Sequence, residues 1–112
     1  MAAFMLIFRG SPARDDSPEQ MQQNLKKWRD WFDVLSSSGV YKGQGAPLET
    51  GGKVVRGTRK AVSDGPYAEA KDLVGGYAII DARNLDVATE IARGCPIYER
   101  DGAVEIRPVR AM

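Results

Sequence analysis

The chain has 112 residues, of which 43% are hydrophobic and 28% charged, values that suit one ordinary globular domain. Its formal charge of +1 provides no field that would attract nucleic acid. With no histidine and one cysteine, the chain cannot supply a zinc-type ligand set or a histidine-activated nucleophile, so we expect no metal and no cofactor.

The single cysteine and the lack of long apolar runs bear on localisation. Cys95 has no partner for an intramolecular disulfide, and no leader-like segment precedes the first apolar run. No apolar stretch approaches the roughly 20 residues that cross a bilayer. We therefore expect a single soluble domain, residues 1–112, in the cytoplasm and without a membrane role.

The first predicted element is a strand. Residues 4–8 form an unbroken apolar run that ends at Arg9 and is too short for a helix. Because no polar residues alternate with the apolar ones, we expect both faces of this strand to be covered.

A helix is predicted to follow. Ser17, Pro18 and Gln20 provide the N-cap, first-turn proline and third-position glutamine of a helix start. Gly39 is the expected end. Spacings of three and four residues predict one buried stripe, made of Met21, Leu25, Trp28, Phe32 and Leu35.

The second half of the chain is predicted to form mainly strands. Glycines between short β-branched runs over 41–63 predict short strands in hairpins. Residues 74–81 predict a longer strand, again with two apolar faces. Residues 103–109 predict a closing strand.

A second helix is predicted between the last two strands. Asn84 is its expected cap, and Gly94 and Pro96 end it. The residues expected to face inward are Leu85, Ala88, Ile91 and Ala92.

This order of elements predicts an α+β fold of the ferredoxin-like, split βαβ type, with an antiparallel sheet and two helices on one face. The strands at 4–8 and 74–81 nevertheless have two apolar faces each. An uncovered sheet face would expose a larger patch than monomers usually tolerate. We therefore expect a homodimer whose sheets pack face to face.

Residues 64–71 read Asp-Gly-Pro-Tyr-Ala-Glu-Ala-Lys and residues 74–77 read Val-Gly-Gly-Tyr. Together with the opening and closing strands, they resemble the YCII-related family, which carries an Asp-Gly-Pro-Phe (DGPF) signature. Tyr67 stands where that signature usually has phenylalanine, which keeps the ring and adds a hydroxyl.

The resemblance covers nearly the whole chain and implies a ferredoxin-like dimeric α+β barrel. Some YCII-like relatives are small enzymes, including a dehydrochlorinase, with a histidine-aspartate pair. This chain has no histidine, so that catalytic pair is not carried over.

Asp64 is the first candidate for a functional side chain. Pro66 has no amide hydrogen, so the common Asx-turn bond to the backbone two residues later is denied to Asp64. Its carboxylate is expected either to complete a structural turn or to face a ligand.

Five further residues complete the candidate site. Glu69 is a second possible acid or base, while Arg9 and Lys71 are candidates to hold an anionic substrate. For Glu69 and Lys71 the competing interpretation is a solvated charge pair. Tyr77 and Tyr67 are expected substrate-binding residues. Arg9 ends an apolar strand, so we expect it to pair with a carboxylate or to reach the rim.

The aromatic residues of the helical stripe and the lone cysteine have simpler interpretations. Trp28 and Phe32 are expected in the core rather than against a cofactor. Trp31 lies just off the stripe, where it lines a cavity or covers the sheet edge. Cys95 is expected to pack at a helix end.

Three functions remain open from the sequence. The first is metal-free acid-base chemistry of the lyase or isomerase type, with Asp64 and Glu69 as the reacting groups. The alternative is a non-catalytic small-molecule-binding or regulatory module, and the third is a scaffold without ligand. A cavity with a buried carboxylate would favour the enzyme, and a cavity without one the binding module.

Overall fold

The structure, a computed structural model, describes residues 1–10, 16–66 and 72–111. Its elements in chain order are β1 (Ala2–Arg9), α1 (Pro18–Ser37), β2 (Tyr41–Pro47), β3 (Gly52–Arg56), β4 (Ala61–Gly65), β5 (Val74–Ala82), α2 (Leu85–Arg93), the 3-10 helix η2 (Pro96–Arg100) and β6 (Ala103–Pro108).

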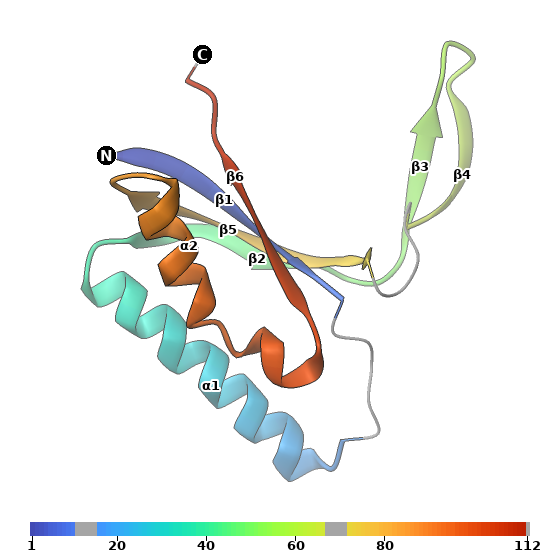
Figure 1. Cartoon of the computed structure of the whole chain (residues 1–112). Helices are drawn as coiled ribbons and strands as arrows, with labels where there is room; N and C mark the ends of the chain where they lie inside the picture. The colour runs from blue at the N-terminus through green and yellow to red at the C-terminus, as the bar shows by residue number, and fades with distance from the viewer. Residues whose placement is uncertain (11–15, 67–71, 112) are drawn as a thin grey trace.

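Four antiparallel strands form the main sheet in the order β2-β5-β1-β6, and α1 and α2 lie on one of its faces (Figure 1). The two central strands, β1 and β5, pair along nearly their whole length, from Ala2 opposite Ala82 to Phe8 opposite Gly76. The predicted α+β fold of ferredoxin-like type is confirmed.

The core lies between the sheet and the helices. Alternate residues of β1 and β5 point toward the helices and are buried, as the pleat of a strand requires. They pack against small side chains of α2 and against η2, forming one cluster of Phe4, Leu6, Phe8, Ala78, Ile80, Ala82, Ala88, Ala92, Cys95 and Ile97.

Both predicted helix starts are confirmed. The Gln20 N–H donates to Ser17 Oγ at 3.2 Å, and the Ser17 N–H donates to Gln20 Oε1 at 2.8 Å, which completes a capping box. The Val87 N–H donates to Asn84 Oδ1 at 2.9 Å at the start of α2.

Three residues predicted to face the core are instead exposed. Met21 and Leu25 are 55% and 51% exposed, because the first turns of α1 lie farthest from the sheet (Figure 1). Leu85 is 47% exposed at the first position of α2. Periodicity gives the direction of a side chain but not how far the opposing sheet extends.

The face of the sheet away from the helices is apolar in its middle. Met5 opposes Ile79 and Ile7 opposes Tyr77 on this surface, and all four are partly exposed. We call these four residues the open face. Both central strands thus carry two apolar faces, as the sequence predicts.

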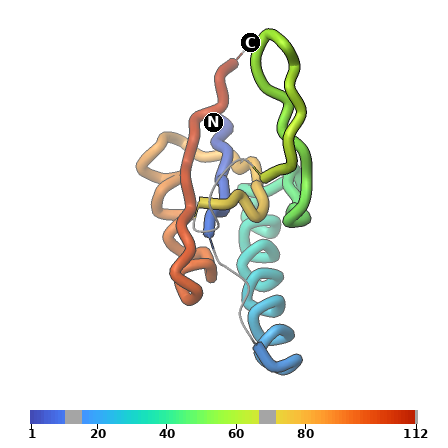
Figure 2. The backbone as a smooth tube through the Cα atoms, turned by 90° about the vertical axis from the view of Figure 1, so that its right-hand side faces the viewer, coloured from blue at the N-terminus to red at the C-terminus, as the bar shows by residue number. Residues whose placement is uncertain are grey.

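Strands β3 and β4 form a separate hairpin that stands away from the main sheet. In Figures 1 and 2 the hairpin is at the top and α1 at the bottom, with the sheet between them. Val55 opposes Val62 in the hairpin, and these side chains are 63% and 65% exposed.

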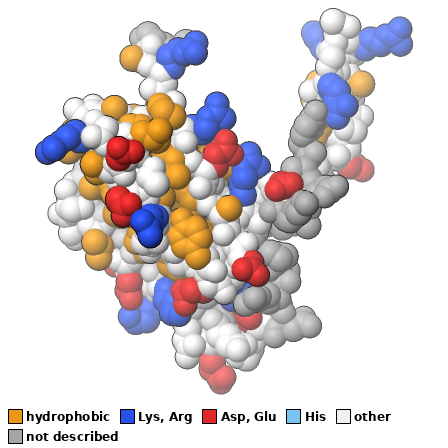
Figure 3. Space-filling model, viewed as in Figure 1, with side chains coloured by type: hydrophobic (Ala, Val, Ile, Leu, Met, Phe, Trp, Pro, Cys, Tyr) orange, Lys and Arg blue, Asp and Glu red, His pale blue; other side chains and the backbone are white. Residues whose placement is uncertain are grey.

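Hydrophobic and charged side chains occupy different parts of the surface in the view of Figure 3. Hydrophobic side chains gather over α2 and β6, flanked by charged groups, and basic side chains mark the hairpin. None of the helices that the structure describes is both long and apolar enough to cross a membrane.

Candidate functional site

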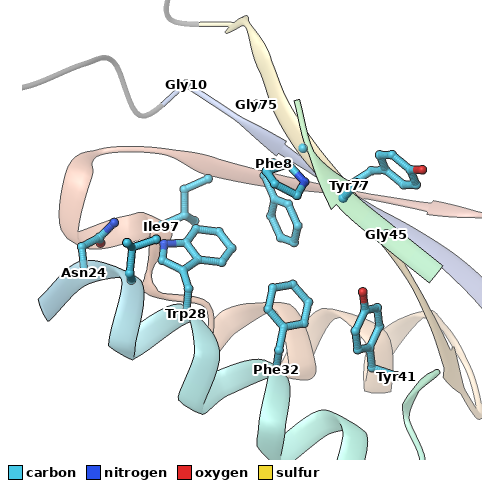
Figure 4. A pocket seen from close by; sticks show the side chains of 14 residues that line it. Phe8, Gly10, Asn24, Trp28, Phe32, Tyr41, Gly45, Gly75, Tyr77 and Ile97 are labelled. Atoms are coloured by element: carbon cyan, nitrogen blue, oxygen red, sulfur yellow. The ribbon is translucent and has the colours of Figure 1, made fainter. Parts of the chain in front are cut away.

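A cavity of about 590 Å³ lies between α1 and the end of the sheet formed by β1, β2 and β5. This volume is within the range of small-molecule sites. Figure 4 shows its lining, which consists of Phe8, Gly10, Asn24, Leu25, Trp28, Phe32, Tyr41, Gly45, Ala46, Pro47, Gly75, Gly76, Tyr77 and Ile97. We call it the helix–sheet cavity.

Aromatic rings form much of the cavity wall. Trp28 and Phe32, one turn apart on α1, have ring planes only 27° apart. Phe8 of β1 meets both of them edge-on, with centroids 5.1 Å from Trp28 and 6.4 Å from Phe32. Tyr41 of β2 continues the wall, 4.9 Å from Phe32.

The strand side of the cavity includes glycines that a side chain would disrupt. A Cβ at Gly45 would lie 2.5 Å from the Tyr77 carbonyl oxygen, because β2 bulges between Tyr41 and Gly45. A Cβ at Gly76 would lie 3.0 Å from the Ala46 carbonyl oxygen. These close approaches require glycine and leave bare backbone beside the cavity.

Polar groups are few in this lining. Among the described residues that form it, none is Asp, Glu, Lys or Arg. The Tyr41 hydroxyl and the Asn24 amide are side-chain groups able to form hydrogen bonds with a ligand. Neither has a hydrogen-bond partner among the residues that the structure describes.

A second cavity, of about 450 Å³, lies at the base of the hairpin. Its charged lining residues are Arg9, Glu49 and Lys53. Asp64 lies beside it, opposite Lys53 in the hairpin register, and its carboxylate pairs with the Lys53 ammonium. The Asp64 side chain is 86% exposed.

Arg9 is held by two partners at the end of β1. Its Nε donates to Glu105 Oε1 at 2.8 Å, and its Nη1 donates to the Asp72 carbonyl oxygen at 2.7 Å. The hydrogen bond from Arg9 lowers the pKa of Glu105 below its ordinary value, against partial desolvation, and Arg107 lowers it further. The expected carboxylate partner of Arg9 is therefore Glu105.

Of the predicted site residues that it describes, the structure brings Arg9 and Asp64 to the hairpin base and places Tyr77 elsewhere. Arg9 lines the hairpin-base cavity, and Asp64 lies beside it. Tyr77 contributes backbone to the helix–sheet cavity, while its side chain points away (Figure 4) and lies on the open face opposite Ile7. Tyr67, Glu69 and Lys71 lie outside the described residues.

Sequence reasoning anticipated a small-molecule pocket, between helix and sheet or near the dimer seam, but it missed the aromatic lining of the helix–sheet cavity. It placed Trp28 and Phe32 in the core, whereas these rings both pack against the core and line the cavity. Tyr41 and Asn24 were not singled out. The sequence does contain a signal for this cavity. Large aromatic side chains on one helix are combined with glycines in β2 and β5, which add no side chain to the space between helix and sheet.

No metal site is evident in the described part of the chain, where no three His, Cys, Asp or Glu side chains lie close enough to hold an ion. The chain is thus a small α+β domain with an aromatic cavity under its long helix. It belongs to the YCII-related domain family, whose model matches residues 3–112, and the resemblance of residues 64–77 is confirmed.

Comparison with solved structures finds a similar fold at low identity. The 5-chloro-2-hydroxyhydroquinone dehydrochlorinase TftG from Burkholderia phenoliruptrix AC1100, in complex with 2,5-dihydroxybenzoquinone, is 17% identical, with 97% of this chain and 95% of that chain covered and a TM-score of 0.49. No curated protein sequence matches the chain significantly.

Proposed function

We propose that the chain is a small-molecule-binding domain whose ligand occupies the helix–sheet cavity without acid-base chemistry there. The observation that carries this proposal is the composition of the cavity wall. Its described residues include several aromatic rings and no carboxylate, ammonium or guanidinium group. Such a wall is suited to binding and has no strong proton donor or acceptor at neutral pH.

Displaced pKa values also point away from catalysis in this cavity. Cys95, Tyr98 and Glu105 have displaced pKa values, and all three lie outside its lining. Perturbed groups in a cleft mark candidate catalytic sites, and of these three it is Glu105 that lies near a cavity, since it pairs with Arg9 at the hairpin base.

Metal-free acid-base chemistry remains the second candidate, at the hairpin base. There Arg9, Lys53 and Glu49 line a cavity beside Asp64, which brings two cations and two carboxylates into one region. In this hypothesis Asp64 and Glu69 exchange protons, and Arg9, Lys71 and Tyr67 hold the substrate.

A thermal-shift screen against a metabolite panel separates the two candidates. A ligand that binds only the folded chain raises the melting temperature. We expect the response to a hit to fall sharply in Trp28→Leu and to persist in Asp64→Asn, with Val34→Ala, an exposed change on α1, as the control. The opposite pattern would favour the hairpin-base site.

We also propose that residues 1–112 act as one cytoplasmic domain that forms a homodimer through the open face, as a dimeric α+β barrel. Support comes from the four partly exposed apolar residues of that face and from the position of both helices on the other side. The free, buried Cys95 agrees with a reducing compartment.

A further inference from the structure

The ligand class of the helix–sheet cavity can be narrowed, on the basis of the proposed function, from the charge of its lining. Burying an ion costs far more free energy than burying a neutral group unless a counter-charge is near. The described residues of the lining offer no such charge. The buried part of the ligand is therefore expected to be uncharged.

A cation held by ring faces is a possible exception, and the ring geometry disfavours it. Cation binding needs ring faces that converge on one point. Here Phe8 meets Trp28 and Phe32 edge-on, at 88° in each case, so these three rings do not present three faces to one point. The rings form a packed wall and not an open box.

The same wall suits a flat ring. The near-parallel planes of Trp28 and Phe32 give one orientation in which a planar ligand can lie against α1. Aromatic pairs in such arrangements gain affinity beyond area burial, roughly two- to tenfold per pair. Gly45 and Gly76 also line the cavity and add no side chain to it.

Besides the Trp28 indole N–H, which only donates, two polar groups are available to orient that ring. The Tyr41 hydroxyl can both donate and accept, and the Asn24 amide can do the same. Both are partly buried and lack partners among the described residues. Hydrogen-bond groups of this kind become satisfied when a ligand supplies a hydroxyl or carbonyl oxygen.

We infer that the helix–sheet cavity selects an uncharged planar aromatic molecule that bears a hydroxyl or carbonyl group. Four probes of one skeleton test this: 2-naphthalenemethanol, its decahydro analogue, 2-naphthoate and (2-naphthylmethyl)trimethylammonium. Binding is followed through the indole N–H signals of isotope-labelled protein, with Trp31, which is outside the lining, as the internal comparison for Trp28.

We expect 2-naphthalenemethanol to shift the Trp28 signal more than the Trp31 signal. It should bind about tenfold or more tighter than either charged probe, and roughly two- to tenfold tighter than the saturated analogue. Equal or tighter binding of a charged or saturated probe would overturn this inference and leave the proposed function standing. If none of the four probes shifts Trp28, the cavity itself is refuted as the binding site.

Two variants give independent tests. Tyr41→Phe should weaken 2-naphthalenemethanol roughly two- to tenfold and leave 2-methylnaphthalene, which has no hydroxyl, unchanged. Leu25→Arg alters a half-exposed lining residue and should strengthen 2-naphthoate at least severalfold, while Val34→Arg on the exposed side of α1 should not. Unchanged probe preference in both Tyr41→Phe and Leu25→Arg would contradict the assignment.

Discussion

At the scale of single residues, Asp64 illustrates how an exposed ion pair differs from a buried one. Its carboxylate pairs with Lys53 while 86% exposed, and such pairs contribute about 0–1 kcal/mol. The Asp16–Arg100 pair joins the segment before α1 to η2, with side chains only 14% and 17% exposed. Removing one partner there leaves a charge that is mostly shielded from water.

We therefore predict that Asp64→Asn and Asp64→Ala each lower the free energy of unfolding by less than about 1 kcal/mol. Asp16→Asn, the matched change at the mostly shielded pair, should cost more, about 1–3 kcal/mol. Urea denaturation of the three variants measures this. A large loss in Asp64→Ala that Asp64→Asn restores would instead identify Asp64 as a structural capping residue.

Among the described residues, burial has its largest effect on the pKa of Cys95. Desolvation raises its pKa to about 12, although a hydrogen bond with the Ile97 backbone opposes the shift. Because the thiolate is the reactive form, we predict that native protein reacts with a thiol reagent at mildly alkaline pH far more slowly than unfolded protein does. Rapid labelling without denaturant would show that the end of α2 opens readily.

The same pKa shift makes the stability of the fold depend on pH. The unfolded thiol ionises near its ordinary pKa of about 9, whereas the folded thiol remains protonated until about pH 12. The stability associated with the neutral buried thiol is thus present below about pH 9 and is lost between those values. Cys95→Ala should flatten this alkaline loss in a pH series of denaturation curves.

At the scale of elements, both helices begin at residues that the sequence identifies correctly. Ser17 accepts from one backbone amide and Asn84 from another, so each removes a donor that the first turn leaves unpaired. We predict that Ser17→Ala and Asn84→Ala each cost about 1 kcal/mol, with Ser37→Ala, near the end of α1, as the neutral control. Thermal unfolding at constant concentration provides the comparison.

The strands and helices were predictable because each has a local cause. The capping box, the glycines at helix ends and the apolar runs of β1 and β5 are all visible in sequence. The 3-10 helix η2 was missed, because Pro96 is the one local signal for it. Leu85 was assigned inward because periodicity cannot show that it stands at the exposed end of α2.

The helix–sheet cavity was less predictable, because its parts are far apart in the chain. Phe8, Trp28, Tyr41 and Gly76 come together only when β1 is placed between β5 and β6 and α1 crosses the sheet. The candidate residues around Asp64 were chosen from a motif, which identifies the family and not the geometry of a site. Their roles stay predictions.

At the scale of the whole molecule, the hairpin and the open face both leave apolar side chains at least partly exposed. A two-stranded hairpin is marginally stable alone in water, and the exposed pair Val55 and Val62 lacks a covering layer. The hairpin lies on the side of the sheet opposite α1, which is also the side of the open face (Figures 1 and 2). A second copy seated on the open face would lie next to it.

The last prediction is that this second copy is present in solution. Light scattering at micromolar concentration should give twice the mass of one chain. Ile7 and Tyr77 oppose each other in the open face, so Ile7→Lys would bury an unpaired charge in each subunit and should yield monomers. Val34→Lys, on the exposed side of α1, should remain dimeric.

Hydrogen exchange then distinguishes the interface from other surfaces. A standard interface covers about 800 Å² of each partner, enough to include the open face and to reach the hairpin. The amide of Val55 should therefore exchange more slowly in the wild-type dimer than in Ile7→Lys, and that of Leu85 on α2 should not change. A dimer that survives Ile7→Lys with protection at Leu85 would place the interface on the apolar surface over α2 and β6, and a monomeric wild type would remove the case for a dimeric barrel.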